Sequence, residues 1–229
     1  MKINMVTLTG VDSSVKSKDL ISISEKYRGL VEWGILYGTK QNSPRYPNIG
    51  RILEFNDSLC GLKHAIHLCG DQAVKYYYGQ FEGSWLNSFY FQRVQLNLPS
   101  YITENLKVNK VVGNVILQYN DQTKDVLVDW FNNQTFRSHD VLFDFSGGNG
   151  QRKKFEEMPS CFDVVGYAGG IGPDTVENDL EEISKVCNRD YVWIDMESSL
   201  RSIVNGKDIF DLDKCENVLD KVVQFNKNN

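Results

Sequence analysis

The sequence predicts an α/β protein folded as a single (β/α)8 barrel, a TIM barrel, over residues 1–229. First, eight short β-branched runs alternate with amphipathic stretches, and strict alternation favours a closed barrel over an open doubly wound sheet. Second, several strands are almost continuously apolar, such as VEWGILY (31–37) and YVWIDM (191–196), as in parallel strands buried on both faces. Third, 229 residues suit one barrel, and no linker or low-complexity tract divides the chain.

Each expected strand is a short run rich in apolar, β-branched or aromatic residues that ends at polar or glycine residues. The expected strands cover residues 3–9, 31–37, 63–68, 91–96, 111–118, 140–145, 163–167 and 191–196.

Between these strands lie stretches with the amphipathic pattern typical of helices that cover a sheet. The expected helices cover residues 18–27, a stretch after Pro47, then 71–78, 101–109, 122–135, 173–186 and 211–225. The segment after Asp144 has room for only a short helix. Pro173 is expected at the first position of its helix, where its missing N–H is harmless.

Composition excludes several classes of protein. Hydrophobic residues make up 41% and charged residues 24%, which is ordinary for a soluble domain. A net charge of −5 without a long basic run argues against nucleic acid as a partner. No apolar run approaches the roughly 20 residues that cross a bilayer, and MKINMVTLTG is a strand pattern and not a leader. Five scattered cysteines without a CxxC pair indicate free thiols in a reducing cytoplasm, and a monomer or homodimer is expected.

The strand ends are polar and glycine-rich, and ligands bind at the C-terminal ends of barrel strands. The strongest motif is GYAGGIGPDTVENDLEEI (166–183), in which an apolar strand runs into Gly169 and Gly170 before a helix. Paired glycines let the backbone approach a ligand, and free N–H groups attract anions, so we expect a phosphate there. The alternative is a tight strand-to-helix turn that needs glycine for its geometry alone.

A second motif, SGGNG (146–150), follows Asp144 at the end of strand six. A strand-end carboxylate before a glycine loop suits an acid or base beneath a closing loop, and a surface loop with a helix-capping aspartate is the alternative. Of the three histidines only His67 falls at a strand end, where a structural role is the alternative to catalysis. No zinc-ligand pattern or Walker motif is present, so no metal or cofactor is expected.

Six segments, in order, resemble the phosphoribosylanthranilate isomerase family of ribulose-phosphate-binding barrels. VTLTG (6–10) stands where that family has K-I-C-G, and VQLN (94–97) where it has V-Q-L-H. The other four are GILYGTKQNSPRYP (34–47), VLFDFSGGNGQ (141–151), AGGIGPDTV (168–176) and IDMESS (194–199). AGGIGPDTV, similar to S-G-G-L-x-P-E-N-V, is the most specific of them.

The resemblance implies an aldose–ketose isomerase that acts on a phosphorylated sugar-amine by an Amadori rearrangement, without a cofactor. Asp144 matches the family's general acid, and Arg45 the arginine that receives the carboxylate of the substrate's aromatic part. The positions that match the phosphate site are Gly169, Gly170, Ser198 and Ser199.

Three departures from the family pattern indicate that the substrate or the reaction has changed. Thr9 replaces the family's base, a cysteine, and a hydroxyl is no base near neutral pH without an activating partner. Asn97 stands in place of a histidine. Glu197 stands where a serine helps to hold phosphate, so Arg201 or Lys207 would have to offset its charge.

Three functions therefore remain open. The first is isomerisation of a phosphorylated sugar or sugar-amine, with Asp144 as acid, with Asp12, Glu197 or His67 as base, and with Thr9, His67 and Arg45 near the substrate. The second is a phosphosugar lyase or aldolase in which Asp195 and Glu197 take a proton or hold a metal. The third is a barrel that binds a phosphorylated ligand or another protein without catalysis.

Overall fold

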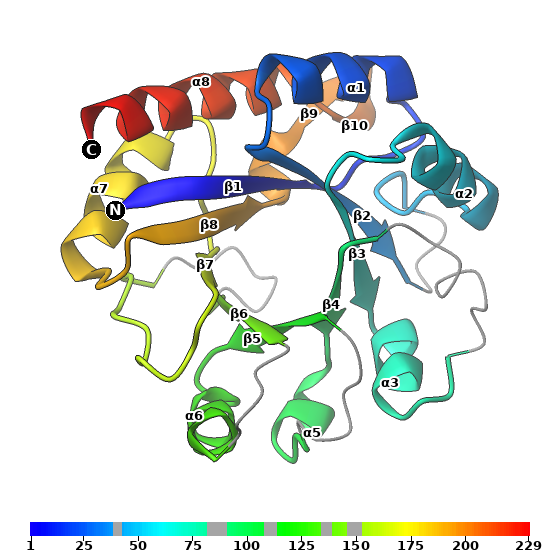
Figure 1. The fold of residues 1–229 in the computed structure, drawn as a ribbon. Helices are drawn as coiled ribbons and strands as arrows, with labels where there is room; N and C mark the ends of the chain where they lie inside the picture. The colour runs from blue at the N-terminus through cyan, green and yellow to red at the C-terminus, as the bar shows by residue number, and fades with distance from the viewer. Residues whose placement is uncertain (39–42, 82–90, 108–113, 134–138, 146–152) are drawn as a thin grey trace.

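The computed structural model describes residues 1–38, 43–81, 91–107, 114–133, 139–145 and 153–229. Eight parallel strands close into a barrel in the order β1 to β8 (Figure 1). Strand β8 pairs with β1 through Thr7 and Asp195 among others. The helices lie around the outside of this barrel (Figure 1). The predicted α/β class and the (β/α)8 architecture are therefore confirmed.

The barrel strands are β1 Lys2–Thr9, β2 Val31–Tyr37, β3 His64–Cys69, β4 Arg93–Asn97, β5 Val115–Tyr119, β6 His139–Phe143, β7 Val165–Tyr167 and β8 Tyr191–Met196. The α-helices are α1 Ser17–Lys26, α2 Ile49–Ser58, α3 Asp71–Tyr77, α5 Ser100–Thr103, α6 Lys124–Asn132, α7 Val176–Val186 and α8 Leu212–Asn228. After β8 come a short 3-10 helix, η2 Ser198–Leu200, and a hairpin of β9 Arg201–Val204 and β10 Lys207–Phe210. No helix in the described ranges is both long enough and apolar enough to span a membrane.

Most helices begin or end one to three residues from their predicted bounds, and α7 and α5 show this most clearly. Helix α7 begins at Val176 and not at Pro173, because the N–H groups of Thr175 and Val176 both donate to the Gly172 carbonyl and form a turn before the helix. Helix α5 covers Ser100–Thr103, where a helix over 101–109 was predicted, and residues 104–107 lie outside the helix.

The β9–β10 hairpin was not predicted, although the sequence carries a signal for it. Asn205 and Gly206 join the two strands with φ values of 51° and 75°. Two successive residues with positive φ are typical of the tight hairpin turn that Asn-Gly favours. The hairpin matters for the site because it carries Arg201 and Asp208.

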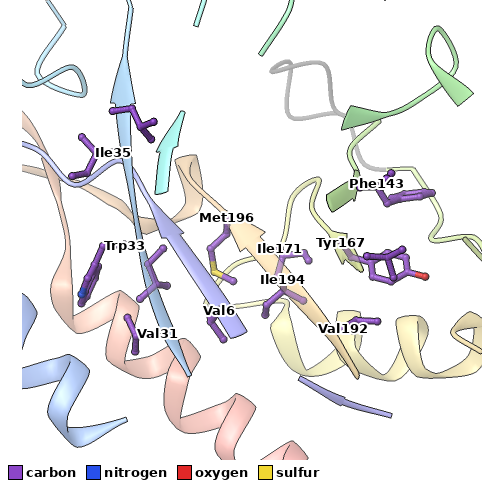
Figure 2. Close-up of a cluster of buried hydrophobic side chains, with 14 of the residues drawn as sticks. Val6, Val31, Trp33, Ile35, Phe143, Tyr167, Ile171, Val192, Ile194 and Met196 are labelled. Carbon is purple, nitrogen blue, oxygen red and sulfur yellow. The ribbon is translucent and has the colours of Figure 1, made fainter. Parts of the chain in front are cut away.

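Alternation along the strands divides the side chains between two cores. Outward-facing residues such as Val6, Trp33 and Ile194 pack in the main cluster between the barrel and its helices (Figure 2). Trp33 is fully buried, and its indole Nε1 donates to Ser24 Oγ at 2.8 Å, which satisfies its polar atom. Burial of each such side chain stabilises the fold by about 1.5–3 kcal/mol. None of the five cysteines forms a disulfide.

Inside the barrel, near the N-terminal ends of the strands, lies a buried ion network. Arg93 Nη2 and Nε bind Glu32 at 2.5 and 3.0 Å, and Nη1 binds Asp140 at 2.9 Å. The Arg93 guanidinium also stacks on the Trp193 ring at 4.5 Å. A Cβ at Gly166 would lie 2.2 Å from that indole, so only glycine leaves room for it. The side chains of this network fill the barrel interior on the N-terminal side of the strand ends.

Candidate functional site

A cavity of about 910 Å³ lies at the C-terminal ends of the barrel strands. Its lining comes from the ends of β1, β3, β4, β5 and β8 and from the segments after β2, β6 and β7. The predicted site residues that line it are Thr9, Arg45, His67, Asp144, Gly169, Gly170, Glu197, Ser198 and Ser199. Asp12, which was also predicted as a site residue, does not line the cavity.

Thr9 and Asp195 form a buried pair at the junction of β1 and β8. Thr9 Oγ1 donates to Asp195 Oδ1 at 2.7 Å, and Asp195 Oδ2 accepts no hydrogen bond from the described residues. Gly34 on β2 makes room for the pair, since a Cβ there would lie 2.3 Å from Thr9 Oγ1. Thr9 is therefore the hydrogen-bond partner of a buried carboxylate.

The pKa of Asp195 is raised to about 7, chiefly because burial disfavours the charged carboxylate. The hydrogen bond from Thr9 lowers it, and the negative charges of Asp144, Glu197 and Glu32 raise it. A carboxyl group with this pKa exchanges protons near neutral pH, which suits a general base. From the sequence, Asp195 was expected only as a carboxylate of the lyase alternative. Its raised pKa depends on burial and on charges from distant segments, which the sequence does not reveal.

Asp144 follows the last residue of β6, and its position is fixed from β5. Gln118 Nε2 donates to Asp144 Oδ2 at 2.9 Å, and the Asp144 N–H donates to the Tyr119 carbonyl at 3.1 Å. Asp144 lines the same cavity as Asp195 and raises the pKa of that residue through its charge. The carboxyl groups of Asp144, after β6, and of Asp195, in β8, thus face the same cavity. The SGGNG loop (146–150) lies outside the described residues.

Arg45, from the segment after β2, is held at the strand-eight side of the cavity. Its Nη1 lies 3.3 Å from Glu197 Oε1 and 3.2 Å from Ser198 Oγ, and its Nε lies 3.2 Å from Asp208 Oδ2. Burial raises the pKa of Glu197, and the charges of Arg45 and, less, Arg201 lower it. The sequence predicted that Arg201 or Lys207 would offset the negative charge of Glu197. In the structure Arg45 has the larger effect on Glu197, and Arg201 has a smaller one. The predicted contact of Arg45 with a substrate carboxylate stays a prediction.

Two of the expected bases are poorly placed or poorly tuned for that role. Asp12 is buried beside the cavity, where its Oδ2 accepts hydrogen bonds from Arg201 Nη2 at 2.7 Å and from the Phe210 N–H at 3.2 Å. It ties the hairpin to the end of β1. Burial and, less, the charge of Arg93 lower the pKa of His67 to about 3, so its neutral imidazole is a weak base.

The loops after β7 and β8 meet at one end of the cavity. Ser199 Oγ donates to the Ile171 carbonyl at 2.7 Å, and a Cβ at Gly172 would lie 2.4 Å from Ser199 Cβ. Gly169 and Gly170 have φ values of 101° and 83°, which glycine adopts without strain. No acceptor in the described part of the chain receives the backbone N–H groups of Gly169, Gly170, Ser198 and Ser199. Such unpaired N–H groups attract an anion.

Within the described ranges, no group of three or more His, Cys, Asp or Glu side chains is arranged to hold a metal ion. Two carboxyl groups, those of Asp144 and Asp195, line the cavity together with the end that carries the unpaired backbone N–H groups.

Two solved structures have a similar fold. Monomers of the dimeric phosphoribosylanthranilate isomerase from Thermotoga maritima align with 97% of this chain and 99% of theirs, at 15% identity and a TM-score of 0.57. A truncated 3-deoxy-D-arabino-heptulosonate 7-phosphate synthase from Thermotoga maritima aligns over 99% of this chain and 87% of its own, at 11% identity and a TM-score of 0.55. No family model and no curated protein matches. At these identities the similarity establishes the barrel fold alone.

Proposed function

We propose that the protein is an isomerase that converts a phosphorylated aldose or aldosylamine to the ketose form by acid–base catalysis. The observation that carries the proposal is the buried Thr9–Asp195 pair, in which burial raises the pKa of the Asp195 carboxyl group to about 7, in the same cavity as Asp144. Asp195 is the base and Asp144 the acid, so Glu197, His67 and Asp12 are left with binding or structural roles.

The proton transfers balance with these two groups. For an aldosylamine, Asp144 donates a proton to the ring oxygen and opens the ring, and Asp195 removes the proton from C2. The resulting enolamine becomes the ketose when Asp195 returns its proton to C1 and Asp144 takes the proton from the C2 hydroxyl. Both carboxyl groups end in their starting states, so no redox partner is needed.

The phosphate assignment rests on the N–H groups of Gly169, Gly170, Ser198 and Ser199 and on the nearby Arg45. Arg45 Nη1 already contacts Ser198 Oγ, so a phosphate at this end would lie within reach of a guanidinium, a favourable phosphate partner. A cavity of about 910 Å³ accommodates a phosphopentose with a small aglycone.

The test is turnover in D2O of a panel of phosphopentoses and their aryl- and alkylamine adducts, followed by NMR. We expect conversion to a ketose with deuterium at C1, and its loss by a factor on the order of 10²–10⁴ in Asp195→Asn and in Asp144→Asn. Glu197→Gln is the comparison variant and should retain proton exchange at C2. Unchanged turnover in Asp195→Asn would show that the base is misassigned.

Two outcomes would favour the alternatives. Activity that chelators abolish would support the lyase or aldolase, although Glu197, one of its two carboxylates, is paired with Arg45 at 3.3 Å. Stabilisation by a phosphopentose without conversion or exchange would support the non-catalytic binding barrel.

A further inference from the structure

The ends of β3 and β4 carry two buried polar atoms that lack hydrogen-bond partners. His67 and Gln95 are paired neighbours in the β3–β4 register, and both line the cavity. Their side chains are 1% and 4% exposed, and neither His67 Nε2 nor Gln95 Oε1 has a partner within the described part of the chain. Buried polar atoms are nearly always hydrogen-bonded in a working protein, so the two atoms point to a ligand.

We propose that His67 and Gln95 form a subsite for a substrate hydroxyl, and that the part of the substrate remote from the phosphate is an uncharged polyol and not a carboxylate-bearing group. The proposal rests on the proposed function in one respect, that the substrate is a phosphorylated sugar.

The orientation of the Gln95 amide is set by a chain of hydrogen bonds. Gln95 Nε2 donates to Asn97 Oδ1 at 2.9 Å, and Asn97 Nδ2 donates to Cys69 Sγ at 3.3 Å. Because the amide nitrogen is engaged, the oxygen of Gln95 is the atom left for a ligand. Asn97, which replaces the family's histidine, thereby orients a binding group.

A hydroxyl group fits both unpaired atoms at once, because it donates one hydrogen bond and accepts others. The imidazole of His67 is uncharged near neutral pH, since burial and Arg93 lower its pKa. With the proton on Nε2, His67 donates to the hydroxyl oxygen, and the hydroxyl proton goes to Gln95 Oε1. A carboxylate has no proton for Gln95, so it would leave that oxygen unsatisfied.

The charges around this subsite also disfavour an anionic group. The other lining side chains on the β3 to β5 side are uncharged: Cys69, Asn97, Ser100, Thr103, Gln118, Asn120 and Gln122. Arg45 is the cation among the described lining residues, and Glu197 and Asp208 already engage it. Asp144 and Asp195 would repel a second anion.

The test measures binding of D-ribose 5-phosphate, its 2-deoxy and 3-deoxy counterparts and inorganic phosphate by calorimetry. For the wild-type protein we expect at least one deoxy sugar to bind about tenfold more weakly than ribose 5-phosphate. Gln95→Leu should lose that difference and keep the wild-type affinity for inorganic phosphate, which also shows that it is folded. Thr103→Val, a change on the same side of the cavity, should keep the discrimination.

A second readout is the ring nitrogen NMR signal of His67, one of only three histidines in the chain. Its Nε2 resonance should move with ribose 5-phosphate and stay in place with inorganic phosphate. Equal affinity of the wild-type protein for all three sugars, or discrimination retained in Gln95→Leu, overturns the subsite. Discrimination without turnover overturns the proposed isomerase and leaves the subsite standing, whereas failure of ribose 5-phosphate to bind at millimolar concentration overturns both.

Discussion

Thr9 on β1 donates a 2.7 Å hydrogen bond to Asp195 on β8, residues 186 positions apart in the chain. The bond stabilises the charged carboxylate and opposes the effect of burial on its pKa. Thr9 therefore holds the pKa of Asp195 near 7 rather than higher. The hydroxyl of Thr9 thereby affects the pH range in which Asp195 is ionised.

Thr9→Val should raise the pKa of Asp195 by on the order of one unit, because a hydrogen bond to a charged group is lost. A base works when ionised, so the acidic limb of the kcat/KM profile, expected near pH 7 in the wild-type protein, should move to higher pH. Thr9→Ser keeps the donor and should keep the profile. An unmoved limb in Thr9→Val would mean that Asp195 does not produce it.

Asp195 should also make folding stability depend on pH. Its folded pKa of about 7 lies above the ordinary value of 3.8, so its contribution is full below pH 3.8 and is lost as pH rises to 7. Asp195→Asn removes the titration, and we expect it to gain roughly 2–4 kcal/mol relative to wild type between pH 4 and pH 8. Urea unfolding of both proteins at the two pH values measures this gain, and parallel pH dependence would contradict it.

Gly172→Ala should weaken phosphate binding. Its Cβ would lie 2.4 Å from Ser199 Cβ and would push the β8 loop away from Gly169 and Gly170. We expect the Kd for inorganic phosphate to rise at least about tenfold, as calorimetry would show. Gly50→Ala, in α2, meets only Asn48 Oδ1 at 3.4 Å and serves as the matched control with unchanged affinity. Equal affinity of the two variants for inorganic phosphate would show that phosphate binding does not depend on the contact between Gly172 and Ser199.

Arg93→Met should destabilise the fold by about 3–5 kcal/mol, because it leaves the buried carboxylates of Glu32 and Asp140 without their cation. Urea unfolding measures the loss. The same change should raise the pKa of His67, since the charge of Arg93 lowers it. The replacement Lys26→Met, on α1, removes an exposed ion pair with Glu216 and should cost much less.

Much of the architecture was predictable from local patterns. Each apolar run became a barrel strand, and the carboxyl ends of those strands brought Asp144, Gly169, Gly170 and Glu197 to one cavity. Parallel strands of a barrel place their ends on one face, so order along the chain is enough to gather these residues. The β9–β10 hairpin was equally predictable from Asn205-Gly206, and its turn signal was overlooked.

The chemistry of the site was not predictable in the same way. The sequence by itself determined the barrel and the polar strand ends. Only the tertiary structure decided that Thr9 serves Asp195, that Arg45 is engaged by Glu197 and Asp208, and that Asp12 belongs to Arg201. A pKa and an ion pair depend on burial and on charges from distant segments, and these distances exist only once the barrel has closed.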